Sequence, residues 1–181
     1  NYNNIPTNNT KFIDQTGVYE RIARLNSRSV KNKSKEDGLK LALGMIDLTT
    51  LEGKDTNFKV KQLCYKAQHP HDNIKGLPQV AAVCVYPTFV NLAKKELKDT
   101  NIKVASVATA FPSGMAKLES RLDEISYAID QGADEIDMVI SRGKFLSGDY
   151  DSIYEEIIKA KKICNDVHLK VILETGELIT L

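Results

Sequence analysis

Short apolar runs alternate with amphipathic stretches along most of the chain, and this alternation restricts the fold more than any other feature of the sequence. Five of the runs have the length of strands, and they cover residues 45–50, 80–86, 102–111, 134–140 and 168–175. The segments between them carry apolar residues at helical spacing. Strands that alternate with helices indicate repeated βαβ units and a parallel sheet.

Local signals predict where the intervening helices begin and end. Asp55 is a candidate N-cap for the helix after the first strand, and Pro87 opens the helix after the second. Gly132 ends the helix after the third strand, whereas residues 143–149 are expected to form a loop. A closed (β/α)8 barrel and an open doubly wound sheet both fit this order. The sequence has no GxGxxG or GxxxxGK[ST] motif, which counts against a nucleotide-binding open sheet.

Composition divides the chain into three parts and limits its partners. Residues 1–16 are rich in asparagine and are expected to form a disordered arm, residues 17–44 a helical extension, and residues 45–181 the strand–helix repeats.

A balance of 25 basic against 24 acidic residues argues against a nucleic-acid partner. No apolar run approaches the roughly 20 residues that cross a bilayer, so we expect no membrane partner. Three scattered cysteines suit a reducing compartment, which predicts a cytoplasmic protein.

Charged residues interrupt three of the apolar strands. Asp47 shares a strand face with Thr49, and Asp137 shares a face with Glu135, because side chains alternate along a strand with a period of two. Lys170 lies within the last apolar run. A buried charge is costly unless it is paired, so these residues predict a polar cluster inside a barrel or crevice. A satisfied structural network, or strand ends that reach solvent, is the alternative interpretation.

Such a cluster favours acid–base or Schiff-base chemistry. A lysine in an apolar cavity can have its pKa lowered, which makes its amine nucleophilic, and a nearby carboxylate can move the protons. Spacing alone therefore predicts Lys170 as the nucleophile and Asp137 as the acid and base. His69 and His71 lie near Cys64 but lack a clustered third ligand, so no metal site is expected.

Five segments resemble the deoxyribose-phosphate aldolase family, in the longer form typical of eukaryotes. They are residues 46–51 (IDLTTL), 81–87 (AAVCVYP), 104–112 (VASVATAFP), 132–139 (GADEIDMV) and 169–178 (LKVILETGEL), and they occur in the family's order. The resemblance implies an α/β fold, a (β/α)8 TIM barrel, of which about the first five βα units are present. It also implies reversible cleavage of 2-deoxy-D-ribose 5-phosphate into acetaldehyde and glyceraldehyde 3-phosphate, in deoxyribonucleotide and carbohydrate catabolism. The reaction runs through a lysine Schiff base without metal or organic cofactor, and a homo-oligomer is compatible with it.

The resemblance also implies roles for individual residues. Asp137 matches the aspartate that moves protons with a bound water, and Lys170 matches a lysine that pairs with that aspartate, in place of the nucleophile expected from spacing. Asp47, Thr49 and Cys84 match residues that line the substrate pocket.

The family's Schiff-base lysine lies on a sixth strand, in a KTSTGK-like segment that this sequence does not contain. The chain therefore resembles the N-terminal portion of an aldolase and is expected to be inactive alone. Two other readings stay open. In the first, the chain is part of another Schiff-base barrel aldolase. In the second, it is a shortened α/β protein that binds a partner without catalysis.

Overall fold

The computed structural model describes residues 13–178 and contains a wholly parallel five-stranded sheet in the order β1-β2-β3-β4-β5. The strands are β1 (Asp47–Thr49), β2 (Ala82–Val85), β3 (Lys103–Ala108), β4 (Glu135–Val139) and β5 (His168–Ile172). Each strand pairs with the next one along the chain, and the strand order never reverses. A doubly wound sheet reverses its strand order at a switch point, whereas a barrel does not. The fold is therefore that of five consecutive units of a (β/α)8 barrel.

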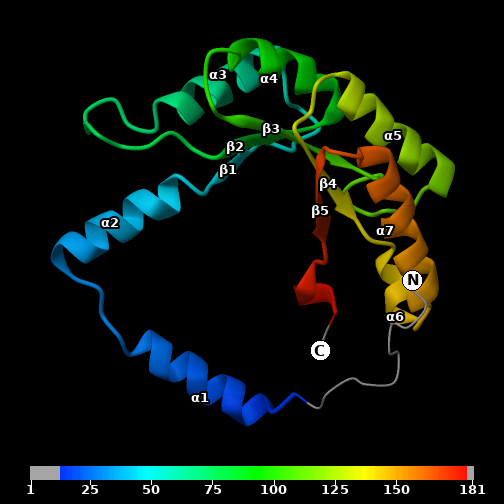
Figure 1. Cartoon of the computed structure of the whole chain (residues 1–181), viewed down its shortest axis with the longest axis horizontal. Coiled ribbons are helices and arrows are strands. Elements are labelled where there is room, and N and C mark those ends of the chain that lie inside the picture. Colours follow the sequence, from blue (N-terminus) through cyan, green and yellow to red (C-terminus); the bar gives the residue numbers. More distant parts are fainter. Residues whose placement is uncertain (1–12, 179–181) are drawn as a thin grey trace.

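Helices cover the convex face of this curved sheet (Figure 1). They are α3 (Asn57–Gln68), α4 (Val90–Glu96), α5 (Leu118–Asp130) and α7 (Tyr150–Cys164), with short turns at η1 (Pro87–Phe89), α6 (Arg142–Leu146) and η2 (Thr175–Glu177). Their apolar stripes pack against outward-facing strand residues in one large core. Cys64 of α3 and Cys164 of α7 are buried there. No helix between residues 13 and 178 is long and apolar enough to span a bilayer.

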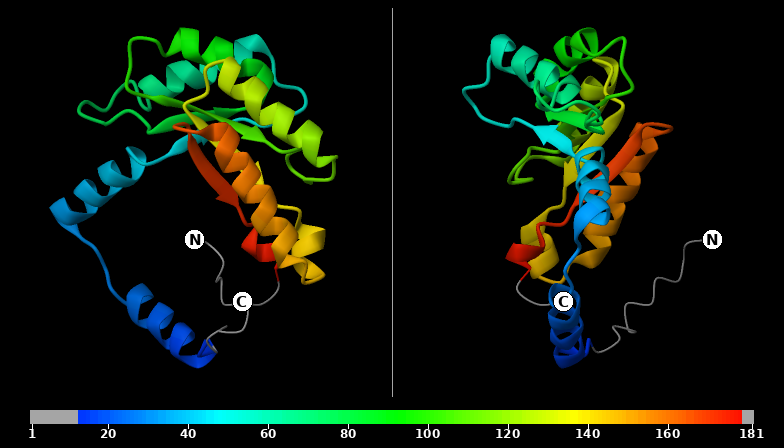
Figure 2. Two further views of the ribbon diagram at one scale, coloured as in Figure 1. Left: turned by 45° about the vertical axis from the view of Figure 1, so that its right-hand side comes forward. Right: turned by 90° about the vertical axis from the view of Figure 1, so that its left-hand side faces the viewer.

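Two helices precede the sheet, α1 (Gln15–Asn26) and α2 (Asn32–Leu43), and they stand away from it in the views of Figure 1 and of Figure 2, left. Neither helix has a buried residue. Residues 1–12, most of the expected arm, lie outside the described part of the chain. The sheet and its covering helices thus form the packed part of the molecule.

Two local predictions are wrong for identifiable reasons. Thr56, not Asp55, caps α3, because the Thr56 hydroxyl accepts the Lys59 N–H at 3.3 Å. The Asp55 carboxylate instead accepts bonds from the Thr50 hydroxyl and the Glu52 N–H, which fixes the turn after β1. The expected loop at residues 143–149 contains most of the short helix α6.

The third strand is shorter than its apolar run because the backbone turns after Ala108. Thr109 and Ala110 both have positive φ angles, 67° and 59°. The Thr109 hydroxyl accepts the Val139 N–H at 2.8 Å, so it ties the end of β3 to the end of β4. The Ala110 N–H donates to Glu124 at 2.7 Å. These bonds hold the loop after β3 at the carboxyl edge of the sheet, where barrel enzymes carry their active sites.

Candidate active site

Four charged side chains meet on the concave face of the sheet. The Lys170 Nζ lies 2.6 Å from Asp47 Oδ2, 3.0 Å from Glu135 Oε2 and 3.1 Å from Asp137 Oδ1. Cys84 adjoins them, with its Sγ 3.7 Å from Asp137 Oδ2. We call these five residues the inner cluster. The three strands expected to contribute inward charges therefore do bring them together.

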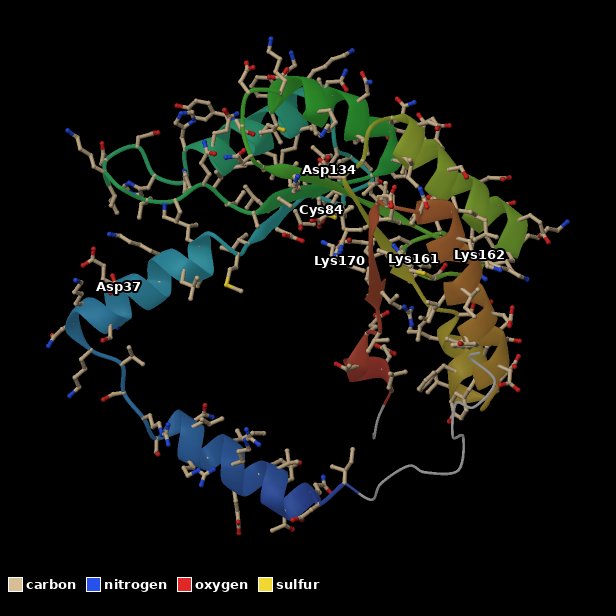
Figure 3. The ribbon with its side chains drawn as sticks, viewed as in Figure 1. Asp37, Cys84, Asp134, Lys161, Lys162 and Lys170 are labelled. Atoms are coloured by element: carbon tan, nitrogen blue, oxygen red, sulfur yellow. The ribbon has the colours of Figure 1, made fainter. Side chains whose placement is uncertain are left out.

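Strand register and sheet curvature explain the meeting. Asp137 and Lys170 are Cα partners on β4 and β5, so their side chains point the same way. Asp47 lies on β1, at the opposite end of the strand order and 123 residues from Lys170. Only a strongly curved sheet brings its two outer strands within hydrogen-bond distance across the concave side. Figure 3 shows Cys84 and Lys170 on this side.

The Asp137 carboxyl has the properties of an acid–base group. Burial raises its pKa, although the adjacent Lys170 ammonium opposes that effect. Its Oδ1 is buried and lies 3.1 Å from Lys170 Nζ, an ion pair without the geometry of a hydrogen bond, and it has no other partner among the described residues. A partly desolvated carboxyl with a raised pKa is suited to take up and return a proton.

Lys170 is held as a cation. Burial alone would lower its pKa, but the contacts with Asp47, Glu135 and Asp137 outweigh burial, and the pKa is raised. A protonated amine has no free electron pair with which to attack a carbonyl. The geometry therefore argues against the nucleophile that spacing predicts and fits the charge partner that the resemblance implies.

Cys84 contributes a neutral donor to the inner cluster. The residue is 3% exposed, and burial together with the Asp137 charge raises the pKa of its thiol to about 12. The thiol thus stays protonated and donates weakly to Asp137 Oδ2. Nearby, Tyr86 and Phe111 meet edge to face at 6.3 Å and pack with Leu51 on the same inner face. The inner cluster therefore borders an apolar wall.

Two residues differ from the expected site. Thr49 donates its hydroxyl to the backbone carbonyl of Asp47 at 2.9 Å, and its substrate role stays a prediction. Glu135 contacts Lys170 directly but was not among the predicted site residues. The sequence feature that indicated Glu135 was its position on the same strand face as Asp137.

The two histidines considered for a metal site have local roles. His69 bonds through Nδ1 with the Tyr65 carbonyl, and His71 Nδ1 accepts the Asn73 N–H. Within residues 13–178, no three histidine, cysteine or acidic residues are grouped so that they could hold a metal ion.

Comparison with known families fits this geometry. The sequence model of the DeoC/LacD family aldolases matches residues 41–179, which include all five strands and every residue of the inner cluster. The chain belongs to the DeoC/LacD aldolase family. Membership accounts for the barrel topology and for charged side chains that line the inner face of the strands.

Individual DeoC/LacD relatives extend the comparison. The human deoxyribose-phosphate aldolase is 44% identical over 180 residues, which cover 93% of this chain and 57% of the human protein. The mouse protein of the same name is 44% identical over 177 residues, covering 92% and 56%. The solved deoxyribose phosphate aldolase of Aeropyrum pernix, described as a tetramer, matches at a TM-score of 0.61 and 27% identity, covering 76% of this chain and 54% of that one. The chain thus spans slightly more than half the length of these relatives.

Proposed function

We propose that this chain supplies the proton-transfer part of a class I aldolase that cleaves 2-deoxy-D-ribose 5-phosphate into acetaldehyde and glyceraldehyde 3-phosphate. The observation that carries the proposal is Asp137, a mostly buried carboxyl with a raised pKa that shares the Lys170 cation with two other carboxylates. Family membership and the names of the human and mouse relatives support the same reaction.

The proposed reaction needs an amine and a proton carrier. A lysine amine adds to the C1 aldehyde of the sugar and loses water, which forms an imine. The C3 hydroxyl then loses its proton as the C2–C3 bond breaks, releasing glyceraldehyde 3-phosphate and leaving an enamine. Protonation of the enamine at C2, followed by hydrolysis, releases acetaldehyde and restores the amine. We assign the proton transfers at the enamine to Asp137, directly or through one water.

The other site residues take supporting roles in this proposal. Lys170 balances the charge of Asp137, and the attacking amine comes from a different lysine. Asp47, Thr49 and Cys84 line the pocket. Residues 45–181 form the catalytic part and residues 17–44 an extension.

The proposal also covers assembly and location. The tetramer of the Aeropyrum pernix relative supports a homo-oligomer. The three buried free cysteines suit the cytoplasm.

A chimera tests the proposed activity. Residues 1–181 replace the matched segment of the human relative, so that the inner cluster is assayed at the relative's full length. We expect the chimera to convert 2-deoxyribose 5-phosphate into acetaldehyde and glyceraldehyde 3-phosphate, and the 181-residue chain alone to be inactive. A folded chimera that leaves this substrate intact but cleaves another sugar phosphate would replace the proposed substrate, and one without any aldol cleavage would refute the proposal.

A further inference from the structure

Glu135 is a third carboxylate in the inner cluster, and the proposed reaction does not use it. It begins β4, two residues before Asp137, and therefore projects to the same face of the sheet. Its Oε2 lies 3.0 Å from Lys170 Nζ, as near as Asp137 Oδ1 at 3.1 Å. The side chain is mostly buried, at 21% exposed, so this ion pair is partly shielded from water.

The Lys170 ammonium is surrounded by more negative charge than it can neutralise. It carries one positive charge and three N–H donors, and three carboxylates lie within 3.1 Å of it. Its hydrogen bond goes to Asp47, and Asp137 Oδ1 receives none. Asp137 Oδ1 therefore shares the ammonium with two other carboxylates and is only partly compensated by it. The position of the ammonium between β1 and β4 maintains this state.

We propose that Glu135 is a positioning residue that shares the Lys170 ammonium with Asp137, so that the charge of the Asp137 carboxylate is only partly compensated and the carboxylate remains able to take up a proton. This inference rests on the proposed function, because it supposes that Asp137 transfers protons. The effect of Glu135 on the pKa of Asp137 can nevertheless be measured without catalysis. Without Glu135, Lys170 would be left with Asp47 and Asp137 as partners, and its ammonium would pair more closely with Asp137. Asp137 would then hold its proton less tightly.

The charged and titratable groups that face Asp137 come from each neighbouring strand that carries one. Lys170 approaches from β5, Asp47 from β1, Cys84 from β2, and Glu135 from β4 itself. On β3, its Cα partner is the apolar Val107. Loss of Glu135 removes one nearby negative charge and strengthens the Lys170 contact, and both changes stabilise the ionised form of Asp137. The expected direction of the pKa change is therefore downward.

The test is a carbon-13 NMR titration of the Asp137 carboxyl in the 181-residue chain, assigned through an Asp137→Asn sample. In Glu135→Gln we expect the pKa of Asp137 to fall by about one pH unit, a tenfold loss of proton affinity. Glu135→Asp separates position from charge. It keeps the negative charge, but its side chain is one methylene shorter and cannot reach Lys170 at the same distance. If Glu135 acts by position, Glu135→Asp lowers the pKa of Asp137 as Glu135→Gln does.

A matched control and a second readout complete the experiment. Glu96→Gln removes a carboxylate from an exposed pair with Lys61 outside the inner cluster, and the pKa of Asp137 should not move. In the chimera, the acid limb of the kcat profile should shift to lower pH in both Glu135 variants. An unchanged or raised pKa in Glu135→Gln, or a wild-type pKa in Glu135→Asp, would overturn the inference. Loss of the proposed function alone would leave the NMR result standing.

Discussion

Lys170 shows how one side chain's neighbours decide its chemistry. The same residue type at the same strand position would be a nucleophile in an apolar cavity, because desolvation would lower its pKa. Here three carboxylates surround the ammonium, and its pKa is raised. Asp137, by contrast, is partly buried, and the nearby Lys170 charge does not fully offset the effect of burial, so the pKa of Asp137 is raised as well. The two shifts support the proposal that Lys170 carries a fixed charge and Asp137 the mobile proton.

The charge on Lys170 leads to a covalent-trapping prediction. When the chimera is incubated with acetaldehyde and borohydride, the reduced adduct should form on a lysine other than Lys170, because a protonated amine does not add to an aldehyde. Peptide mass spectrometry locates the adduct. Finding it on Lys170 would reverse the roles assigned above.

The cysteines allow a second prediction at this scale. All three are buried, and burial raises the pKa of each thiol, to about 11 for Cys64 and about 12 for Cys84. Since the thiolate is the reactive form, the folded protein at pH 8 should resist alkylation by iodoacetamide. The same protein in urea should react at all three positions. Rapid labelling of Cys84 in the folded state would contradict its assignment as a neutral donor.

The sequence allowed much of the residue-scale picture to be predicted, and its omissions have physical reasons. Asp47, Asp137 and Lys170 were recognisable because charges within apolar strands need partners. Glu135 lies at a strand end, where a charge normally reaches solvent, so its face alone did not single it out. That Asp47 contacts Lys170 depends on the curvature of the whole sheet, which no local pattern records.

At the scale of elements, a second ion pair joins the outer helices. Arg121 of α5 and Glu156 of α7 are each 3% exposed and lie 2.9 Å apart. Glu156 also accepts bonds from Ser141 and from Lys144 of α6. This network connects three helices on the convex face, and its loss would leave a charge buried without a partner.

Breaking this pair should destabilise the fold strongly. Arg121→Met is expected to lower the free energy of unfolding by about 3–5 kcal/mol, because Glu156 is then left buried with weaker compensation. Urea unfolding followed by circular dichroism measures the loss. The double variant Arg121→Met with Glu156→Leu should lose less than Arg121→Met alone. A double variant that is less stable than the single one would refute this account of the pair.

The same pair predicts a pH dependence. Burial would raise the pKa of Glu156, but its bonds to Arg121, Lys144 and Ser141 outweigh burial and lower it below the ordinary value of 4.5. A lowered folded-state pKa gives stability that is present above pH 4.5 and is lost as pH falls through the folded value. The stability difference between the wild type and Glu156→Gln should therefore shrink from pH 7 to pH 3. A difference that stays constant over this range would show that the charge of Glu156 is not responsible.

The elements themselves were predicted better than their ends. Short apolar runs predicted the five strands, and the period of 3.6 residues predicted the four covering helices, because both patterns reflect which faces are buried. The third strand was predicted too long because positive φ angles at Thr109 and Ala110 turn the backbone inside an apolar run. The helix α6 was missed because its five residues are too few to show a period.

At the scale of the whole molecule, the strand order answers a question that the pattern of elements left open. A barrel and a doubly wound sheet share the same alternation, and only the sequential order β1 to β5 separates them. The curvature then brings β1 and β5 together through the Asp47–Lys170 contact. The inner cluster is thus a product of the curvature of the whole sheet.

The proton-transfer role of Asp137 is the central claim, and the kcat of the chimera tests it most directly. Asp137→Asn keeps the shape of the side chain but cannot exchange a proton, so kcat for 2-deoxyribose 5-phosphate cleavage should fall by about 10²–10⁴-fold with an unchanged circular dichroism spectrum. Asp99→Asn, a matched change at an exposed position, should leave kcat unaltered. A folded Asp137→Asn chimera with wild-type kcat would contradict the account.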